Sequence, residues 1–182
     1  MTGSQMHYIA LVAEEPILTE IAQFKDEMLE QFGCRAAMKS PAHITLIPPF
    51  YWSRGMQKIL MDTFRGFRSE VEELDIRVNG FGHFKRNVLF AAPEHNVPLL
   101  QLQRDCVDYF RPLLGDKIAE KRPFHPHITI ANRDLKSEDF DRAWEMFQNR
   151  PYIREWTVDK LSLLQHDGSR WQVIDDLKWT KV

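Results

Sequence analysis

The sequence predicts an α+β fold in which two similar halves are related by pseudo-twofold symmetry. Strand-like and helix-like segments alternate along the 182 residues, and the order βαβαβ occurs twice before one last strand. The segment Pro41–Leu46, with the letters PAHITL, returns 84 residues later as His125–Ile130, with the letters HPHITI. A duplicated chain with this symmetry brings equivalent strands face to face at its centre. The two copies of the motif should therefore meet there.

The first half begins with an apolar strand and an amphipathic helix. The apolar residues of this helix recur at helical spacing, and Lys25 falls among them. Gly33 ends the helix in the usual C-terminal way. A β-branched strand from His43 stops at Pro48-Pro49, and Ser53 is the expected N-cap of a second helix. The expected elements are a strand at 8–13, a helix at 17–32, a strand at 43–47, a helix at 53–67 and a strand at 74–81. A strand at 87–92 then begins the second half.

The second half repeats this order and adds a closing strand. The turn Asp167-Gly168-Ser169 separates the last two strands. The expected elements are a helix at 97–114, a strand at 127–131, a helix at 137–148, and strands at 153–164 and 171–179.

Length and composition predict one compact domain over residues 1–182. With 43% hydrophobic residues, the chain is long enough to bury a core. Its longest apolar runs are far shorter than the roughly 20 residues that a membrane span requires, so we expect no membrane association. The first five residues are polar and lack the basic and apolar regions of a secretory signal, from which we expect a cytoplasmic protein.

The cysteine content and the net charge argue against a disulfide scaffold and against a protein that binds duplex nucleic acid over a broad surface. Cys34 and Cys106 show neither CxxC spacing nor the density of a disulfide scaffold, so we expect both to be reduced and without a chemical role. The net charge of −2 argues against a broad surface for duplex nucleic acid, which needs many Lys and Arg side chains. A nucleic-acid end or a small phosphorylated ligand, bound by a few donors in a pocket, fits this charge.

The repeated motif places an imidazole and a hydroxyl on one face of each strand. Successive side chains of a strand point to opposite faces, so His43 and Thr45 share one face, and His127 and Thr129 share the equivalent one. The Ile and Leu residues between them anchor the strands in the core. This division suits a rigidly held site.

Two histidines and two threonines suit the cleavage of a phosphodiester. One group must take a proton from the attacking hydroxyl or water, and another must give a proton to the leaving oxygen. Histidine, with an unperturbed pKa of about 6.5, does either near neutral pH. The threonine hydroxyls can bind the non-bridging oxygens. A single His-x-Thr pattern arises easily by chance, but two copies at equivalent positions of a repeat favour a functional pair over a structural one.

The letters HITL at 43–46 and HITI at 127–130, set in a duplicated chain, resemble the motifs of the 2H phosphoesterase superfamily. Within it, the 2′-5′ RNA ligase and RNA 2′,3′-cyclic phosphodiesterase-like proteins are the most similar branch. The resemblance extends over nearly the whole chain, from the strand at Tyr8 to the one near Trp179. It implies a bilobal fold with an antiparallel sheet in each lobe around a central cleft.

The resemblance also implies an activity and a set of site residues. The activity is hydrolysis, or reversible formation, of a ribose 2′ or 3′ phosphodiester, such as a 2′,3′-cyclic phosphate or a 2′,5′ linkage, without metal or cofactor. The partner is then an RNA end or a nucleotide, and we expect a monomer. His43 and His127 are the implied catalytic pair, and Thr45 and Thr129 the phosphate ligands. Similar enzymes commonly use the second histidine as base, which assigns His127 as base and His43 as acid, although the symmetry permits the reverse.

Four further residues are candidates for binding substrate. RNA-processing relatives often carry an Arg close behind the second motif, whereas here Ala131-Asn132 come first and Arg133 follows. If the strand extends to Arg133, this side chain points to the same face as His127 and Thr129, toward the cleft. An Arg exposed to solvent at the end of the strand is an equally good interpretation. Arg86, in a polar loop, is a second phosphate candidate. Tyr51 and Phe124 flank the motifs and are candidates for stacking on a base, although packing explains most aromatic residues.

Three alternatives stay open at the level of sequence. His125 has the same parity as His127, so these two with His43 could form a three-histidine metal site, but Pro126 disturbs the alternation and no carboxylate accompanies the set. Within enzymes, the substrate could be a small cyclic nucleotide or a cyclic ADP-ribose phosphate. A non-catalytic module that only binds RNA ends or nucleotides is the alternative from another class.

Overall fold

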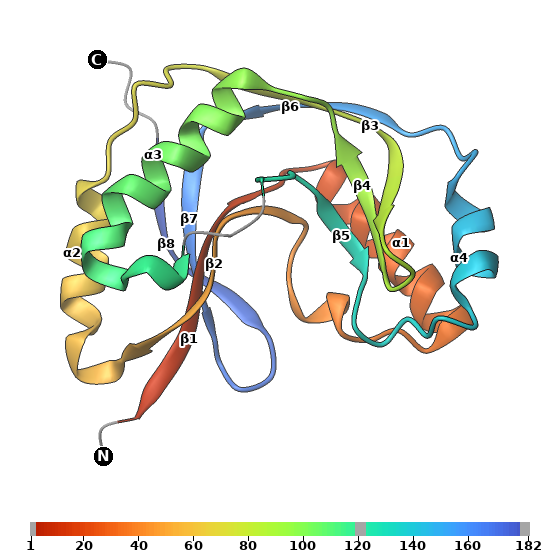
Figure 1. Cartoon of the computed structure of the whole chain (residues 1–182), viewed down its shortest axis with the longest axis horizontal. Helices are drawn as coiled ribbons and strands as arrows, with labels where there is room; N and C mark the ends of the chain where they lie inside the picture. The colour runs from red at the N-terminus through yellow and green to blue at the C-terminus, as the bar shows by residue number, and fades with distance from the viewer. Residues whose placement is uncertain (1–2, 119–122, 179–182) are drawn as a thin grey trace.

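The structure is a computed structural model that describes residues 3–118 and 123–178. It contains two four-stranded sheets that form two lobes side by side (Figure 1). The first sheet has the strand order β2-β1-β7-β8, the second has the order β5-β4-β3-β6, and all neighbouring strands are antiparallel. The predicted α+β class with two antiparallel sheets is therefore confirmed.

The helices and strands alternate in the order that the sequence predicts. The strands are β1 (Ser4–Val12), β2 (His43–Ser53), β3 (Leu74–Phe84), β4 (Val88–Pro93), β5 (Ile128–Ala131), β6 (Ile153–Val158), β7 (Lys160–His166) and β8 (Trp171–Lys178). The α-helices are α1 (Ile17–Phe32), α2 (Gln57–Gly66), α3 (Val97–Leu114) and α4 (Phe140–Phe147).

Each lobe is assembled from both halves of the chain. Strand β7, from the second half, pairs with β1, and β3, from the first half, pairs with β4. The helices are exchanged too, because α1 packs against β5 and α3 packs against β2 (Figure 1). The strands in equivalent places, β1 with β4, β2 with β5 and β7 with β3, keep the 84-residue offset. The repeat is thus present, but the lobes are not the two contiguous halves.

The single strand predicted at 153–164 is wrong, because Asp159 divides it into β6 and β7 in different sheets. Along β6, buried Trp156 and Val158 alternate with more exposed residues, as on a sheet with one covered face. Strand β7 lies inside its sheet, between β1 and β8. Residues 161–164 are all buried, as in a strand with both faces covered. The change from alternating to continuous burial marks the crossing from one lobe to the other.

The strand that begins at His43 does not stop at the two prolines. Strand β2 continues through Pro48 and Pro49 to Ser53, which pairs with Ser4. Strand β2 lies at the edge of the sheet, so a proline whose N–H would face outward loses no ladder bond. The pairing with β1 also shifts register here, so that both prolines lie opposite Tyr8 at a β-bulge, where a missing N–H is tolerated. The next helix accordingly starts later than predicted, at Gln57 after a 3₁₀ turn, and Ser53 makes no side-chain capping bond.

Other element boundaries agree more closely with the sequence. Gly33 has φ 71°, and its N–H donates to the carbonyl oxygen of Leu29 over 2.9 Å, so the predicted end of α1 is confirmed. Helix α4 is shorter than predicted, with Phe140 and Phe147 buried at its two ends. Among the described residues, no helix is both long enough and apolar enough to cross a membrane.

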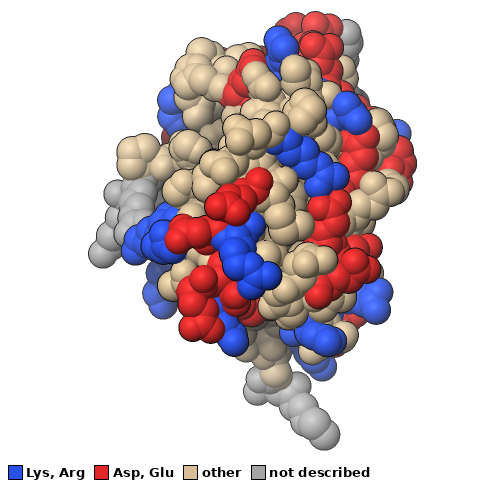
Figure 2. All heavy atoms as spheres, turned by 90° about the vertical axis from the view of Figure 1, so that its right-hand side faces the viewer, with Lys and Arg blue, Asp and Glu red and all other residues tan. Residues whose placement is uncertain are grey.

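The fold brings β2 and β5 into contact at the boundary between the lobes, where the two motifs lie. Phe64 of α2 and Phe110 of α3 are fully buried in the first lobe, and Phe147 of α4 is fully buried in the second. On the face around α4, Lys and Arg side chains are interspersed with Asp and Glu (Figure 2). That face carries no broad basic surface.

Candidate active site

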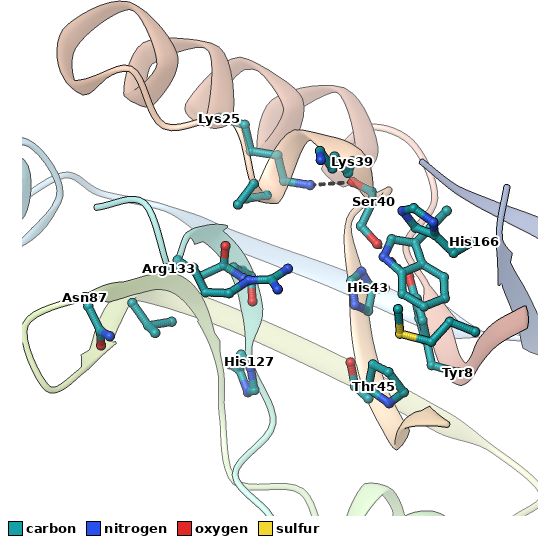
Figure 3. Close-up of a pocket in the computed structure, with 18 residues that line it drawn as sticks. Tyr8, Lys25, Lys39, Ser40, His43, Thr45, Asn87, His127, Arg133 and His166 are labelled. Carbon is teal, nitrogen blue, oxygen red and sulfur yellow. Dashed lines mark hydrogen bonds between the residues drawn. The ribbon is translucent and has the colours of Figure 1, made fainter. Parts of the chain in front are cut away.

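A cavity of about 630 Å³ lies at the boundary between the lobes, and both copies of the motif line it (Figure 3). His43 and Thr45 come from β2, Thr129 comes from β5, and His127 immediately precedes β5. The residues between them, Ile44, Leu46, Ile128 and Ile130, are buried in the core. Strand alternation therefore divides each motif into a cavity face and a core face.

Both imidazoles are held in the same way by the backbone two residues earlier. Nδ1 of His43 donates to the carbonyl oxygen of Pro41 over 2.7 Å, and Nδ1 of His127 donates to that of His125 over 2.8 Å. A carbonyl oxygen only accepts, so the proton of each neutral ring is on Nδ1. Nε2 then carries the lone pair in both rings. The repeat thus duplicates the tautomer as well as the residue.

His43 is placed so that its neutral form is favoured. Burial lowers the pKa of His43 to about 4, and the positive charges of Lys25 and His127 act in the same direction, against the opposing bond to Pro41. The ring of Tyr8 lies 4.9 Å from the His43 ring, measured between centroids. The hydroxyl groups of Tyr8 and Ser40 are hydrogen-bonded over 2.7 Å, which holds this support in place. At neutral pH, His43 in the free protein is therefore in its neutral form.

His127 lies between this cavity and a second one of about 580 Å³. Its ring contacts Phe84 edge to face, with the centroids 4.9 Å apart. The two cavities share Thr45, Asn87, Val88 and His127. Aromatic and basic side chains line the rest of the second cavity, including Phe84, Phe124, His125 and Lys85. The histidine pair thus has a polar space on one side and an aromatic space on the other.

The other predicted site residues fall in different places. Arg133, two residues beyond β5, lines the first cavity and adopts the left-handed conformation with φ 36°. Phe124 lines the second cavity. Arg86 lines neither, because its guanidinium donates to Asp141 over 2.8 Å. Tyr51 is 70% exposed and lines neither cavity.

The structure adds cavity residues that the sequence analysis missed. They include Tyr8, Lys25, Lys39, Ser40, Asn132 and His166. One signal for Lys25 was present, because it occupies an apolar position of the α1 pattern, where a charged residue is unusual. The others lie in strands and turns, where no pattern distinguished them.

His125 does not join a metal cluster in the part of the chain that the structure describes. No group of three His, Cys, Asp or Glu side chains there is arranged to hold a metal ion. His125 lines the second cavity, and His43 lines only the first. A metal-free mechanism stays a prediction that an experiment must test.

Asp134 connects the loop after the second motif to the segment that carries Lys39 and Ser40. Its Oδ2 accepts the backbone N–H groups of Arg35 over 2.6 Å and of Ala36 over 2.8 Å. Hydrogen bonds to a charged acceptor contribute more than neutral ones. This carboxylate therefore fixes residues 35–40, which form one wall of the cavity, to the loop after β5.

Replacing Asp134 with alanine should lower the free energy of unfolding by about 1 to 3 kcal/mol, because two backbone donors lose their acceptor. It should also weaken substrate binding, since residues 35–40 lose their attachment. Denaturant titration measures the first effect and KM the second. Asp134→Asn, which keeps an acceptor oxygen, should lose less. Wild-type stability and KM in Asp134→Ala would show that this contact does not hold the wall.

A family model described as the 2′-5′ RNA ligase superfamily matches residues 13–170. The chain belongs to the 2′-5′ RNA ligase superfamily. This confirms the resemblance to 2H phosphoesterases inferred from the two motifs and supports an enzyme of the phosphoesterase type. A search of curated proteins finds no match.

Solved structures with a fold similar to that of this chain include LigT of E. coli, TT0787 of Thermus thermophilus and Usb1 of Kluyveromyces marxianus. LigT complexed with 3′-AMP has a TM-score of 0.67 and 18% identity, with 98% of this chain and 100% of that chain covered. TT0787 has a TM-score of 0.65 and 19% identity, covering 96% and 97% of the two chains. Usb1 has a TM-score of 0.54 and 11% identity, covering 95% and 97%. At these identities the similarity establishes the shared fold.

Proposed function

We propose that this protein is a metal-independent phosphoesterase that cleaves, or reversibly forms, a phosphodiester at a ribose 2′ or 3′ oxygen. The observation that supports this best is the pair of imidazoles that line one cavity with the same tautomer. In-line displacement at phosphorus needs a proton acceptor and a proton donor on opposite sides. Two Nε2 atoms presented by equivalent strands are suited to both tasks.

The burial of His43 favours one assignment of the base and the acid. Burial keeps the pKa of His43 low, so His43 is neutral at pH 7 and serves as the base that activates water. His127 is then the acid that protonates the leaving ribose oxygen. This reverses the assignment that the resemblance suggested. Thr45, Thr129 and Arg133, which line the same cavity, bind the non-bridging oxygens and stabilise the charge that develops there.

The nucleoside of the substrate fits the second cavity. Phe84 and Phe124 offer aromatic surface for a base beside His127, as in proteins that bind single-stranded nucleic acid. LigT, which has the same fold, has been crystallised with 3′-AMP, NADP+ and ATP. A nucleotide or an RNA end is therefore the proposed substrate class.

The direct test is turnover by the purified protein on three substrate types. These are 2′,3′-cyclic mononucleotides, an oligoribonucleotide with a cyclic phosphate end, and a 2′,5′-linked dinucleotide. We expect hydrolysis of at least one, followed by product chromatography. Tight nucleotide binding with no turnover on any of them would favour the binding module instead.

Activity should survive exhaustive treatment with EDTA, because the two imidazoles supply the proton transfers and the described cavity residues supply the phosphate contacts. The measurement is the rate before and after chelation, with dialysis to remove the complexed metal. Loss of activity that zinc or manganese restores would instead identify a catalytic metal, with His125 as the first ligand to examine.

A further inference from the structure

One end of the active-site cavity carries positive charge without a carboxylate. Lys25 of α1, Lys39 and Arg133 line the cavity, and its described lining includes no Asp or Glu. Within residues 3–118 and 123–178, none of the three forms an ion pair. Lys25, Lys39 and Ser40 gather at the end of the cavity away from Thr45 (Figure 3).

Lys25 is costly to the fold in this position. It is only 5% exposed, and its Nζ donates to the carbonyl oxygen of Ser40 over 2.8 Å. Burial lowers the pKa of Lys25 to about 8, so the ammonium remains mostly charged at neutral pH. A buried charge is normally paired with an opposite charge, because its desolvation is expensive. A bound anion would supply the negative charge that the described cavity lining does not offer to Lys25.

The cavity has room for more than the phosphate that is cleaved. Its volume of about 630 Å³ is in the range that accommodates a whole small molecule. The reacting phosphate belongs between His43 and His127, beside the two threonines, and the aromatic cavity for the base opens past Thr45 and His127. Lys25, Lys39 and Ser40 line the cavity of the reacting phosphate and do not line the aromatic cavity, so they lie beside the reacting phosphate and apart from the base.

We propose that Lys25, Lys39 and Ser40 form a second anion subsite, which binds a further phosphate group carried on the 5′ oxygen of the nucleotide being cleaved. This inference rests on the proposed function and narrows its substrate class to nucleotides with two phosphate groups. A free nucleotide supplies the second group as a monoester, and an RNA end supplies it as a diester. In both substrates a negatively charged phosphate pairs with the lysines, in the role that a carboxylate of the protein would otherwise have.

The test compares adenosine 2′,3′-cyclic phosphate with the same compound carrying a 5′-phosphate. The 5′-phosphate should raise kcat/KM by about 10-fold to 100-fold, as expected for charge-assisted hydrogen bonds in a buried subsite. In Lys25→Met, which keeps the shape of the side chain, this ratio should fall toward one. A dinucleotide with a cyclic phosphate end, where the 5′ group is a diester, distinguishes the RNA end from the free nucleotide.

Lys58→Met is the matched control, because Lys58 has an 87% exposed side chain outside both cavities and its loss changes the net charge equally. It should keep the wild-type ratio. An equal loss on both substrates in Lys25→Met would mean that Lys25 acts only on the reacting phosphate or on His43, and would overturn the subsite. If Lys25→Met does not fold, Lys39→Met tests the same ratio.

Binding without turnover separates this inference from the proposed function. If the wild type cleaves neither substrate, the proposed activity fails, but calorimetry with 5′-AMP and adenosine still tests the subsite. The wild type should bind 5′-AMP more tightly, and Lys25→Met should lose that difference. Equal affinity of the wild type for the two compounds would overturn the inference.

Discussion

Replacing either His43 or His127 with alanine should reduce kcat on the preferred phosphodiester by a factor of about 10² to 10⁴. Each change removes one of the two proposed proton transfers and leaves the proposed phosphate ligands Thr45, Thr129 and Arg133, which line the cavity, in place. The double variant should lose much less than the product of the two factors, because the groups act as a unit. Steady-state kinetics of the three variants measures this directly.

Two comparisons make the result specific. Thr45→Ala and Thr129→Ala should each cost less than a histidine change, since each removes one hydrogen bond to phosphate. His95→Ala, at an exposed position that lines neither cavity, should keep wild-type kinetics. Near wild-type turnover in His43→Ala or His127→Ala, on every phosphodiester that the parent cleaves, would remove that residue from the mechanism.

The repeat was visible in the sequence, but the exchange of elements between the lobes was not. Local periodicity identified α1 and the two motif strands, and the 84-residue offset identified which segments are equivalent. Which strand pairs with which is a tertiary choice. Asp159 illustrates the limit, because the apolar run on either side of it reads as one strand while its two parts belong to different sheets. Pro48 and Pro49 illustrate another, since they are tolerated because β2 lies at the sheet edge and shifts register against β1 at this point.

The site residues were predictable where the alternation of side chains along a strand coincided with the 84-residue repeat. Strand parity and the repeat together selected His43, Thr45, His127 and Thr129, and all four line one cavity. Lone basic residues carried no such second signal. Arg86 was a candidate from its loop, yet its partner Asp141 lies 55 positions further along the chain, so no local pattern shows the pair.

The roles of the two histidines should separate when the leaving group no longer needs a proton. On a nucleoside phosphodiester with 4-nitrophenolate as leaving group, His127→Ala should keep most of the wild-type rate, because an acid is not required. His43→Ala should still lose a factor of about 10² to 10⁴, because water must be activated in either case. Release of 4-nitrophenolate at one fixed pH gives the three rates. The opposite pattern would restore His127 as the base.

The dependence on pH then identifies the group that remains in His127→Ala. Burial and the nearby charge of Lys25 hold the pKa of His43 at about 4 in the complete site. A base acts only when it is neutral, so kcat/KM on the aryl ester should rise as the pH increases through this region and stay level above it. Removing His127 also removes its charge, which shifts this limb slightly upward, since that charge lowers the His43 pKa. Activity that instead falls as the pH rises through the same region would mean that the protonated form of His43 does the work, and the low pKa would then be a cost of its burial and not the basis of its role.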